Sequence, residues 1–367
     1  MRRILFQIHV WVGVLTGLYV CVVCVTGAAL VFRIDLQRAL HPHLFTVRAN
    51  GPLADPVTVM ESVSRAYPQH RLSGVEAPTT LRPTYLAYVT SGAEFRTVLI
   101  DPVSARVLGE LPDHIAIRTL REVHYNLLGG RTGRVINGVG ACAILVLCAS
   151  GLVIWWPGTR SWGRGFVVDF SRESRRLVWE LHRAVGIWSV AFIAMSAITG
   201  LAFVFPSGFR AIVNVVLTVA VARSPQSLVP GDATARPSWR TVIDRARLHA
   251  PGLPVARVVM PFGDRGAFLV QFAPEDPTPA GSDLTSVYLD QYTGDPIANS
   301  AASRTWGNAV IASMAPLHVG SVGGQAGRVL WFVFGLVPAL LFMTGLMTWW
   351  HRVVRPRLSS RAADDAD

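Results

Sequence analysis

Four long apolar stretches constrain this chain more than any other feature of its sequence. A helix needs about 20 mainly apolar residues to cross the roughly 30 Å hydrocarbon core of a bilayer. Stretches of that length occupy positions 8–32, 135–156, 185–205 and 329–350. The chain is 51% hydrophobic and 16% charged, whereas soluble proteins carry about a quarter charged residues. The sequence therefore predicts a membrane α-helical protein with four transmembrane helices.

The connections between these stretches differ in length and charge, and they predict the topology. The second connection and the tail are short and rich in arginine, and such loops stay in the cytoplasm. We therefore place both termini in the cytoplasm and the two long connections in the periplasm, as in a multi-pass protein of a bacterial inner membrane. Arg2 and Arg3 precede the first stretch, and the arginines of the second connection and the tail are Arg160, Arg164, Arg172, Arg175, Arg176, Arg183, Arg352, Arg355, Arg357 and Arg361.

This topology divides the chain into eight parts. A cleaved signal peptide would also begin with arginines and an apolar run, but the same pattern recurs in the third stretch, so we interpret the first as a retained span. The predicted parts are a first span (1–34), a periplasmic unit (35–118), an outer histidine segment with the second span (119–157), a cytoplasmic loop (158–181), a third span (182–206), a linker with a second periplasmic unit (207–312), an outer histidine segment with the fourth span (313–351) and a cytoplasmic tail (352–367).

The two halves of the chain repeat one another, which predicts a tandem duplication. The first stretch shares its pattern with the third, and matched residues lie 173 positions apart; the second shares its pattern with the fourth, at 194 positions. The matched pairs are His9 and His182, Gly13 and Gly186, Thr26-Gly27 and Thr199-Gly200, His124 and His318, Gly129-Gly130 and Gly323-Gly324, and Gly151 and Gly345.

The two long connections resemble each other as well, and each predicts a small α+β unit. In each, a segment with helical spacing precedes three stretches with strand-like alternation. The predicted helix and strands are 57–67, 71–76, 84–90 and 95–101 in the first unit, and 239–249, 255–261, 266–273 and 286–290 in the second.

Four of the ten histidines sit at repeated positions, and they predict two metal sites. Parallel duplicated halves are usually related by an axis along the membrane normal. Such an axis brings His9 toward His182 on the inner side, and His124 toward His318 on the outer side. Two imidazoles facing each other suit the axial positions of a b-type haem, so we predict two haems b. A proton relay or hydrogen bonds between helices are the alternatives.

Other residues near these histidines bear on the same two sites. Gly13, Gly17 and Gly186 lie on the histidine-bearing faces and leave room for a flat macrocycle. His351 ends the fourth stretch as a spare inner ligand or an interfacial residue. The nearby arginines either hold haem propionates or reach to the membrane interface; they are Arg134 and Arg328, with Arg131, Arg3 and Arg183.

The net charge of +11 does not indicate nucleic-acid binding. The arginines gather beside apolar segments and do not line an aromatic-studded groove. Cys21 and Cys24 form a C-x-x-C pattern inside an apolar stretch, where a thiolate is disfavoured. We interpret them as packing residues.

The duplicated pattern resembles the family of PepSY-associated transmembrane-helix proteins, of the iron-regulated membrane protein or inner-membrane ferric-siderophore reductase type. His9 with Gly13, and His182 with Gly186, match its opening motif, and His124 and His318 match its outer histidines. The resemblance implies a di-haem oxidoreductase with PepSY-like outer units. An inner quinol or flavoprotein donor would supply electrons, and a periplasmic ferric siderophore would be reduced to release Fe(II).

Two other functions stay open on the sequence. One is a di-haem relay to a different outer acceptor. The other is a haem-free scaffold whose PepSY-like units bind or inhibit periplasmic proteases. No nucleotide-binding glycine motif is present, so direct docking of NAD(P)H is not expected.

Overall fold

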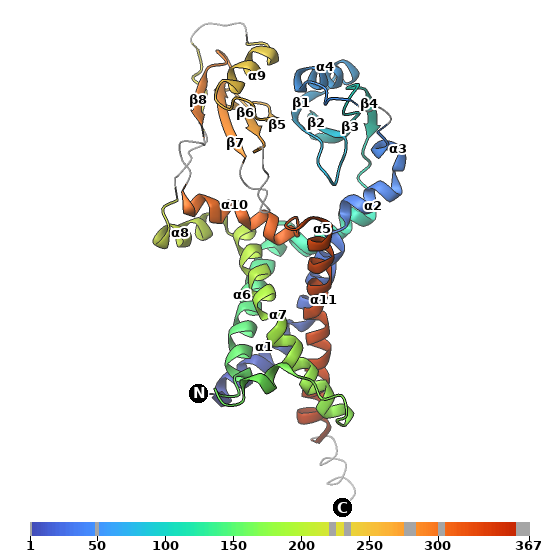
Figure 1. The fold of residues 1–367 in the computed structure, drawn as a ribbon, viewed down its shortest axis with the longest axis vertical. Coiled ribbons are helices and arrows are strands. Elements are labelled where there is room, and N and C mark those ends of the chain that lie inside the picture. The colour runs from blue at the N-terminus through green and yellow to red at the C-terminus, as the bar shows by residue number, and fades with distance from the viewer. Residues whose placement is uncertain are drawn as a thin grey trace, which may run out of the picture. The chain divides into compact units, whose positions relative to one another are not determined.

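A computed structural model describes residues 2–47, 51–219, 225–230, 236–274, 284–299 and 305–356. Arg357 and Arg361 of the predicted tail lie outside these residues. The chain forms two compact units, each assembled from separate stretches (Figure 1). The helical unit comprises residues 1–32, 115–212 and 314–367. The sheet unit comprises residues 33–114 and 213–313.

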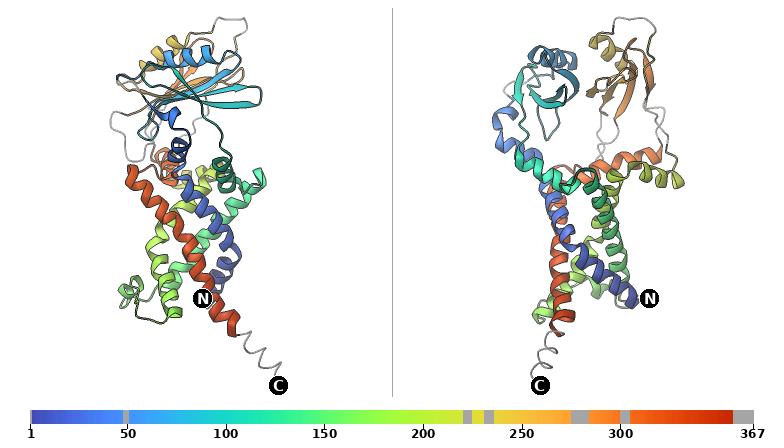
Figure 2. Two further views of the ribbon diagram at one scale, coloured as in Figure 1. Left: turned by 90° about the vertical axis from the view of Figure 1, so that its right-hand side faces the viewer. Right: turned by 180° about the vertical axis from the view of Figure 1, so that it is seen from behind.

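The helical unit is built on four long helices that are apolar enough to cross a membrane. They form a closed ring in which α1 contacts α6 and α11, and α7 contacts the same two helices (Figure 2). All four predicted stretches lie in these helices. All four helices begin earlier than these stretches, because polar, arginine-bearing turns continue each helix beyond its apolar part. Their bounds are α1 (Arg2–Leu30), α6 (Gly130–Trp155), α7 (Ser174–Val204) and α11 (Gly324–Trp349), which a π-helical turn, η3 (Trp350–Val354), extends.

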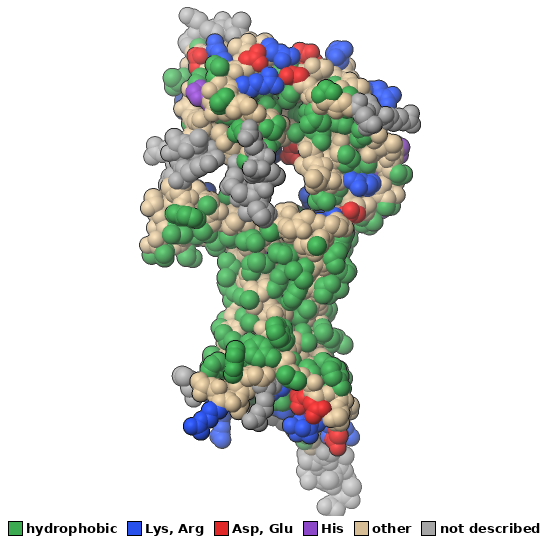
Figure 3. Space-filling view, in the orientation of Figure 1, with side chains coloured by type: hydrophobic (Ala, Val, Ile, Leu, Met, Phe, Trp, Pro, Cys, Tyr) green, Lys and Arg blue, Asp and Glu red, His purple; other side chains and the backbone are tan. Residues whose placement is uncertain are grey.

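The outward surface of this bundle is apolar along most of its length (Figure 3). Large side chains such as Leu15, Val139 and Trp188 are more than 60% exposed. Water would disfavour such a surface, whereas the hydrocarbon of a bilayer favours it, and each helix satisfies its own backbone hydrogen bonds. The bundle is thus suited to lipid.

Shorter helices adjoin these spans in the sequence. α5 (Ile115–Asn126) precedes α6, and α10 (Trp306–Val319) leads into α11. α8 (Pro206–Val216) follows α7, and the 3₁₀ turn η1 (Trp162–Phe166) lies between α6 and α7. Within η1, Phe166 packs edge-on against Trp155 and Trp188.

The sheet unit holds one antiparallel sheet of eight strands, in the order β4-β3-β2-β1-β5-β6-β7-β8. α4 (Pro56–Ala66) and α9 (Trp239–Arg247) cover one face (Figure 2). On the other face, Leu44 and Phe45 of α3 (Pro42–Phe45), which follows α2 (Arg33–Leu40), pack against Leu86 and Leu99. The strands are β1 (Arg71–Glu76), β2 (Tyr85–Ser91), β3 (Glu94–Ile100), β4 (Val107–Glu110), β5 (Val255–Val259), β6 (Ala267–Phe272), β7 (Thr285–Asp290) and β8 (Pro296–Asn299).

Both halves of the sheet therefore contain a fourth strand that the sequence analysis did not predict. The halves also join into a single sheet, because β1 pairs with β5 through Val75 and Val258. The join needs Gly74, since a Cβ atom there would lie 2.8 Å from the Val258 carbonyl oxygen. The two halves have the same strand order; that they are copies of one ancestor stays a prediction.

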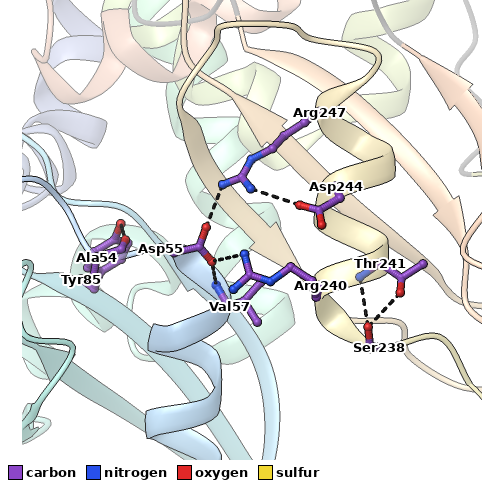
Figure 4. Close-up of polar contacts among 9 residues, drawn as sticks. All are labelled: Ala54, Asp55, Val57, Tyr85, Ser238, Arg240, Thr241, Asp244 and Arg247. Carbon is purple, nitrogen blue, oxygen red and sulfur yellow. Dashed lines mark hydrogen bonds and ion pairs between the residues drawn. The ribbon is translucent and has the colours of Figure 1, made fainter.

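Ion pairs reinforce this join (Figure 4). Asp55 caps α4 by accepting a hydrogen bond from the Val57 amide, and its carboxylate lies 3.2 Å from Arg240 and 3.0 Å from Arg247 of α9. Burial alone would raise the pKa of Asp55, but the hydrogen bonds and the two guanidinium groups outweigh it and lower the pKa below 3.8. Asp55 therefore links the two halves of the sheet unit as an anion.

Candidate functional site in the helical unit

The structure brings His9 and His182 together within the helical bundle. Both lie near the starts of long helices, His9 on α1 and His182 on α7. Their ring centroids are 6.3 Å apart, and the ring planes are nearly perpendicular at 86°. Both side chains are partly buried. We call this the inner pair.

His124 and His318 form the second pair, which we call the outer pair. Their ring centroids are 6.1 Å apart and the planes are tilted by 40°. The sequence analysis placed them just before the second and fourth spans, and the structure puts them on α5 and α10, two helices of their own.

Glycine-rich corners turn each of these short helices into the following span. Leu127 and Leu128 have positive φ values of 49° and 58° between α5 and α6. A Cβ atom at Gly133 would lie 1.7 Å from the Asn126 carbonyl oxygen, and one at Gly327 would lie 1.9 Å from that of Val322. Only glycine allows so close an approach. The repeated Gly-Gly-x-x-Gly pattern therefore directs His124 and His318 back toward the bundle.

The two pairs lie at different depths of the bundle. Gly27 borders the ring of His124, and it follows His9 on the same helix by 18 positions. Gly200 borders His318 and follows His182 by the same number. At 1.5 Å per residue, the levels are separated by about 27 Å along the helix axis. That distance is close to the thickness of a bilayer core, about 30 Å.

In each pair the Nδ1 atoms of the histidines face side-chain hydroxyl groups. The distances from Nδ1 to the hydroxyl oxygen are 3.0 Å for His9 and Ser150, 2.9 Å for His182 and Thr344, 2.8 Å for His318 and Thr199, and 3.5 Å for His124 and Thr26. Each ring also has a backbone carbonyl beside it that belongs to the residue three positions before the hydroxyl residue. These carbonyls are those of Leu147, Leu341, Ser196 and Val23, and the Val23 oxygen lies 2.9 Å from Nδ1 of His124.

These contacts determine which ring nitrogen carries the proton. A carbonyl oxygen only accepts hydrogen bonds, so Nδ1 of His124, which faces the Val23 oxygen, must be the N–H nitrogen. At the other three histidines the facing hydroxyl can donate its proton to the carbonyl four residues earlier in its helix, and it then accepts from Nδ1–H. The neutral ring then leaves Nε2 with its lone pair, which is the form in which imidazole binds a metal. All four histidines are therefore prepared to bind through Nε2.

Glycines give these rings their space, although they are not the glycines that the sequence analysis selected. A Cβ atom would lie 2.6 Å from His124 at Gly27, 3.1 Å from His9 at Gly151, 3.2 Å from His182 at Gly345 and 3.6 Å from His318 at Gly200. In contrast, the ring of Phe342 packs on Gly17, and Leu147 lies beside Gly13. The expectation that Gly13 and Gly17 leave open room is thus wrong for Gly17.

The spacing of each pair fits a metal atom held between two imidazoles. A bond from a metal ion to an imidazole nitrogen is about 2 Å, and the ring centre lies about 1 Å behind the nitrogen. Two opposed rings on one metal therefore have centroids about 6 Å apart, as both pairs have. Among the described residues, no group of three or more His, Cys, Asp or Glu is placed to hold a metal ion by itself. Two opposed ligands suit a metal that brings its other ligands with it, as haem iron does.

Comparison with known proteins identifies the family. A family model described as the PepSY-associated TM region matches residues 6–352, nearly the whole chain. The chain belongs to this family. It is also 27% identical over 262 residues to an uncharacterized protein of Pseudomonas aeruginosa. That match covers 65% of this chain and 64% of the relative, so the chain spans somewhat less than two thirds of the relative's length.

The two arginines predicted as propionate ligands hold helix ends in this PepSY-associated protein. Arg134 donates to the Phe203 carbonyl near the end of α7 at 2.6 Å. The buried Arg328 donates to the Val31 carbonyl beyond α1 at 2.9 Å, and its guanidinium lies 4.8 Å from the centre of the Phe32 ring. A guanidinium has five N–H donors, so these contacts are compatible with binding an anion as well. The propionate role stays a prediction.

His351 belongs to neither pair. It lies in η3 at the end of α11, and its Nδ1 is buried without a hydrogen-bond partner within the described part of the chain. Its role as a further inner ligand stays a prediction.

Proposed function

We propose that this chain is a di-haem b oxidoreductase of the inner membrane that reduces periplasmic ferric siderophores. The observation that carries the proposal is the paired geometry: two imidazole pairs with metal-bridging spacing, about one bilayer thickness apart. Membership of the PepSY-associated TM family and the four candidate spans of this chain support this role.

The protein residues would bind and orient the cofactors. His9 and His182 would hold the inner haem, and His124 and His318 the outer one, each through Nε2. Arg134 and Arg328 lie on the spans that follow the outer histidines and would balance propionate charge there. When bound, haem iron supplies reversible one-electron chemistry between Fe(III) and Fe(II). All four histidines are partly buried among the surrounding helices.

The proposed net reaction takes one electron from a quinol or flavoprotein on the cytoplasmic side and reduces one Fe(III) in the siderophore to Fe(II). Hard oxygen ligands hold Fe(II) less tightly than Fe(III), because Fe(II) carries less charge and is softer. The reduced metal is therefore released while the carrier stays intact.

The orientation in the proposal rests on charge. Arg2 and Arg3 lie in the first turn of α1. Further arginines lie in the connection between α6 and α7 and in the first turn of α7, where Arg172 pairs with Asp169 and Arg176 pairs with Glu180. By the positive-inside rule these ends face the cytoplasm. The inner pair, near the starts of α1 and α7, then lies on the cytoplasmic side.

Visible spectroscopy of the purified full chain tests the cofactor. We expect a Soret band and a reduced b-type α-band from two haems per chain. His124→Ala or His318→Ala should remove one of the two haems, whereas His249→Ala, an exposed residue of the sheet unit, should keep both. Well-folded protein from haem-replete cells with no Soret band would exclude the proposal and leave the scaffold function.

Mixing the reduced protein with ferric siderophores tests the substrate. Oxidation of the haem with formation of Fe(II), trapped by a ferrous chelator, is the expected result. If only other acceptors oxidise the protein, the chain is a relay and not a siderophore reductase.

A further inference from the structure

We propose that four hydroxyl residues position the histidines and set the redox potentials of the metals bound to them. This role rests on the proposed function. The four are Ser150 and Thr344 at the inner pair, and Thr26 and Thr199 at the outer pair.

The direction of each hydrogen bond follows from the other hydrogen bond that the hydroxyl group makes. Each hydroxyl has one proton, and each lies within donating distance of the carbonyl four residues earlier in its helix. These distances are 2.6 Å from Ser150 to Val146, 2.9 Å from Thr344 to Leu340, 2.9 Å from Thr199 to Met195 and 2.8 Å from Thr26 to Val22. The hydroxyl oxygen then has its lone pairs left to accept the Nδ1–H of the histidine.

Such a bond affects the metal through the imidazole. An acceptor at Nδ1–H fixes the tautomer and the ring orientation, and it makes the ligand more basic. A more basic axial ligand favours the oxidised metal and lowers its reduction potential. Removing the hydroxyl should therefore raise the reduction potential of the metal at that level. Because the Ser196 carbonyl still faces His318, the rise is partial at that histidine.

Every contact also joins two helices. Ser150 on α6 holds His9 of α1, and Thr344 on α11 holds His182 of α7. Thr199 on α7 holds His318 of α10. These bonds alone would be consistent with helix packing, so a test must measure a property that packing does not change.

The outer pair offers a matched comparison. Thr199 and Thr26 are the same residue type at the same level, but their oxygens lie 2.8 Å and 3.5 Å from the histidine they face. A separation of 3.5 Å is at the limit of a hydrogen bond, and the Val23 carbonyl serves His124 at 2.9 Å instead. Thr199 therefore positions His318 strongly, whereas Thr26 positions His124 only weakly.

Potentiometric titration of the full chain, followed at the haem α-band, tests this role in Thr199→Val, Thr199→Ser and Thr26→Val. For Thr199→Val we expect one of the two midpoint potentials to rise by up to about 59 mV, which is a tenfold change in the preference for Fe(II) over Fe(III). Thr199→Ser keeps the hydroxyl and should keep the potential. Thr26→Val should shift it by less than half as much. An unchanged potential in Thr199→Val, or an equal shift in Thr26→Val, would overturn the positioning role.

A second measurement separates this inference from the proposed function. The ¹⁵N chemical shifts of histidine distinguish an Nδ1–H from an Nε2–H ring. If the purified chain carries no haem, the proposed function fails, and the same preparation still reports on the positioning role. His318 should then be in the Nδ1–H form in the wild type and lose part of that population in Thr199→Val. Equal populations in the two proteins would reject the positioning role as well.

Discussion

A single added methyl group beside the outer pair should affect His124 and His318 differently. In Gly27→Ala, the new Cβ atom would lie 2.6 Å from Cε1 of His124, whereas in Gly200→Ala it would lie 3.6 Å from Cε1 of His318. Ordinary contacts begin at 3.4 Å, so His124 must retreat by about 0.8 Å while His318 stays where it is. Binding groups need to be held within about 0.5 Å of their working geometry.

The expected costs follow from these displacements. Overpacking of this kind costs about 1–3 kcal/mol, and it is concentrated on a predicted axial ligand. We expect Gly27→Ala to fold but to lose most of the outer haem, so that the haem content falls from two per chain toward one. Gly200→Ala should keep both haems. Haem content is measured as the pyridine haemochrome against protein concentration, with helix content by circular dichroism.

Gly208→Ala provides the control for substitution itself, because nothing lies within 4 Å of a Cβ atom there. Haem loss in Gly200→Ala equal to that in Gly27→Ala would refute the reasoning, as would full haem content in both. The first result would mean that both sites are equally tight, and the second that His124 is not a ligand.

The sheet unit gives two further predictions, both measured by hydrogen exchange with mass spectrometry on the full chain. The lowered pKa of Asp55 means that its stabilisation is present above the ordinary carboxyl pKa and is lost as the pH falls through the lower pKa of the folded state. Asp55→Asn, which can still cap α4, should remove this pH dependence and lower the free energy of unfolding by about 1 kcal/mol or less. Unaltered acid sensitivity of α4 and α9 in this variant would contradict the prediction. Phe272 is fully buried in β6, so Phe272→Ala should lower the free energy of unfolding by about 3–5 kcal/mol. Phe262 is 90% exposed, so Phe262→Ala should change the exchange protection little. Equal effects of the two substitutions would contradict the assigned core.

The sequence predicted most of the helical unit because its signals are local. An apolar run of about 20 residues indicates a span wherever it occurs, and repeated histidines at one offset indicate a common depth. The predicted strands agree for the same reason, since 71–76 and 255–261 show their alternation within a few residues. The pairing of His9 with His182 followed from symmetry alone.

The features that the sequence did not predict depend on contacts between distant residues. The strands β4 and β8 have four residues each, too few to show a period. The join between β1 and β5 depends on a Gly74 that looks like any other glycine in the sequence. The hydroxyl partners did leave a signal, because Thr26-Gly27, Ser150-Gly151, Thr199-Gly200 and Thr344-Gly345 place a hydroxyl before a glycine at matched positions of the repeated spans.

These hydroxyl–glycine dipeptides also show how each half contributes to the site. Ser150 and Thr26 support histidines of the first half, and Thr344 and Thr199 support those of the second. Each pair of histidines, in contrast, takes one member from each half. Each half thus orients its own imidazoles, and only the two halves together would hold the proposed metals, each between two imidazoles. A symmetric dimer of two-span units would have the same arrangement, which is the physical reason that a repeat in the sequence predicts pairs in the structure.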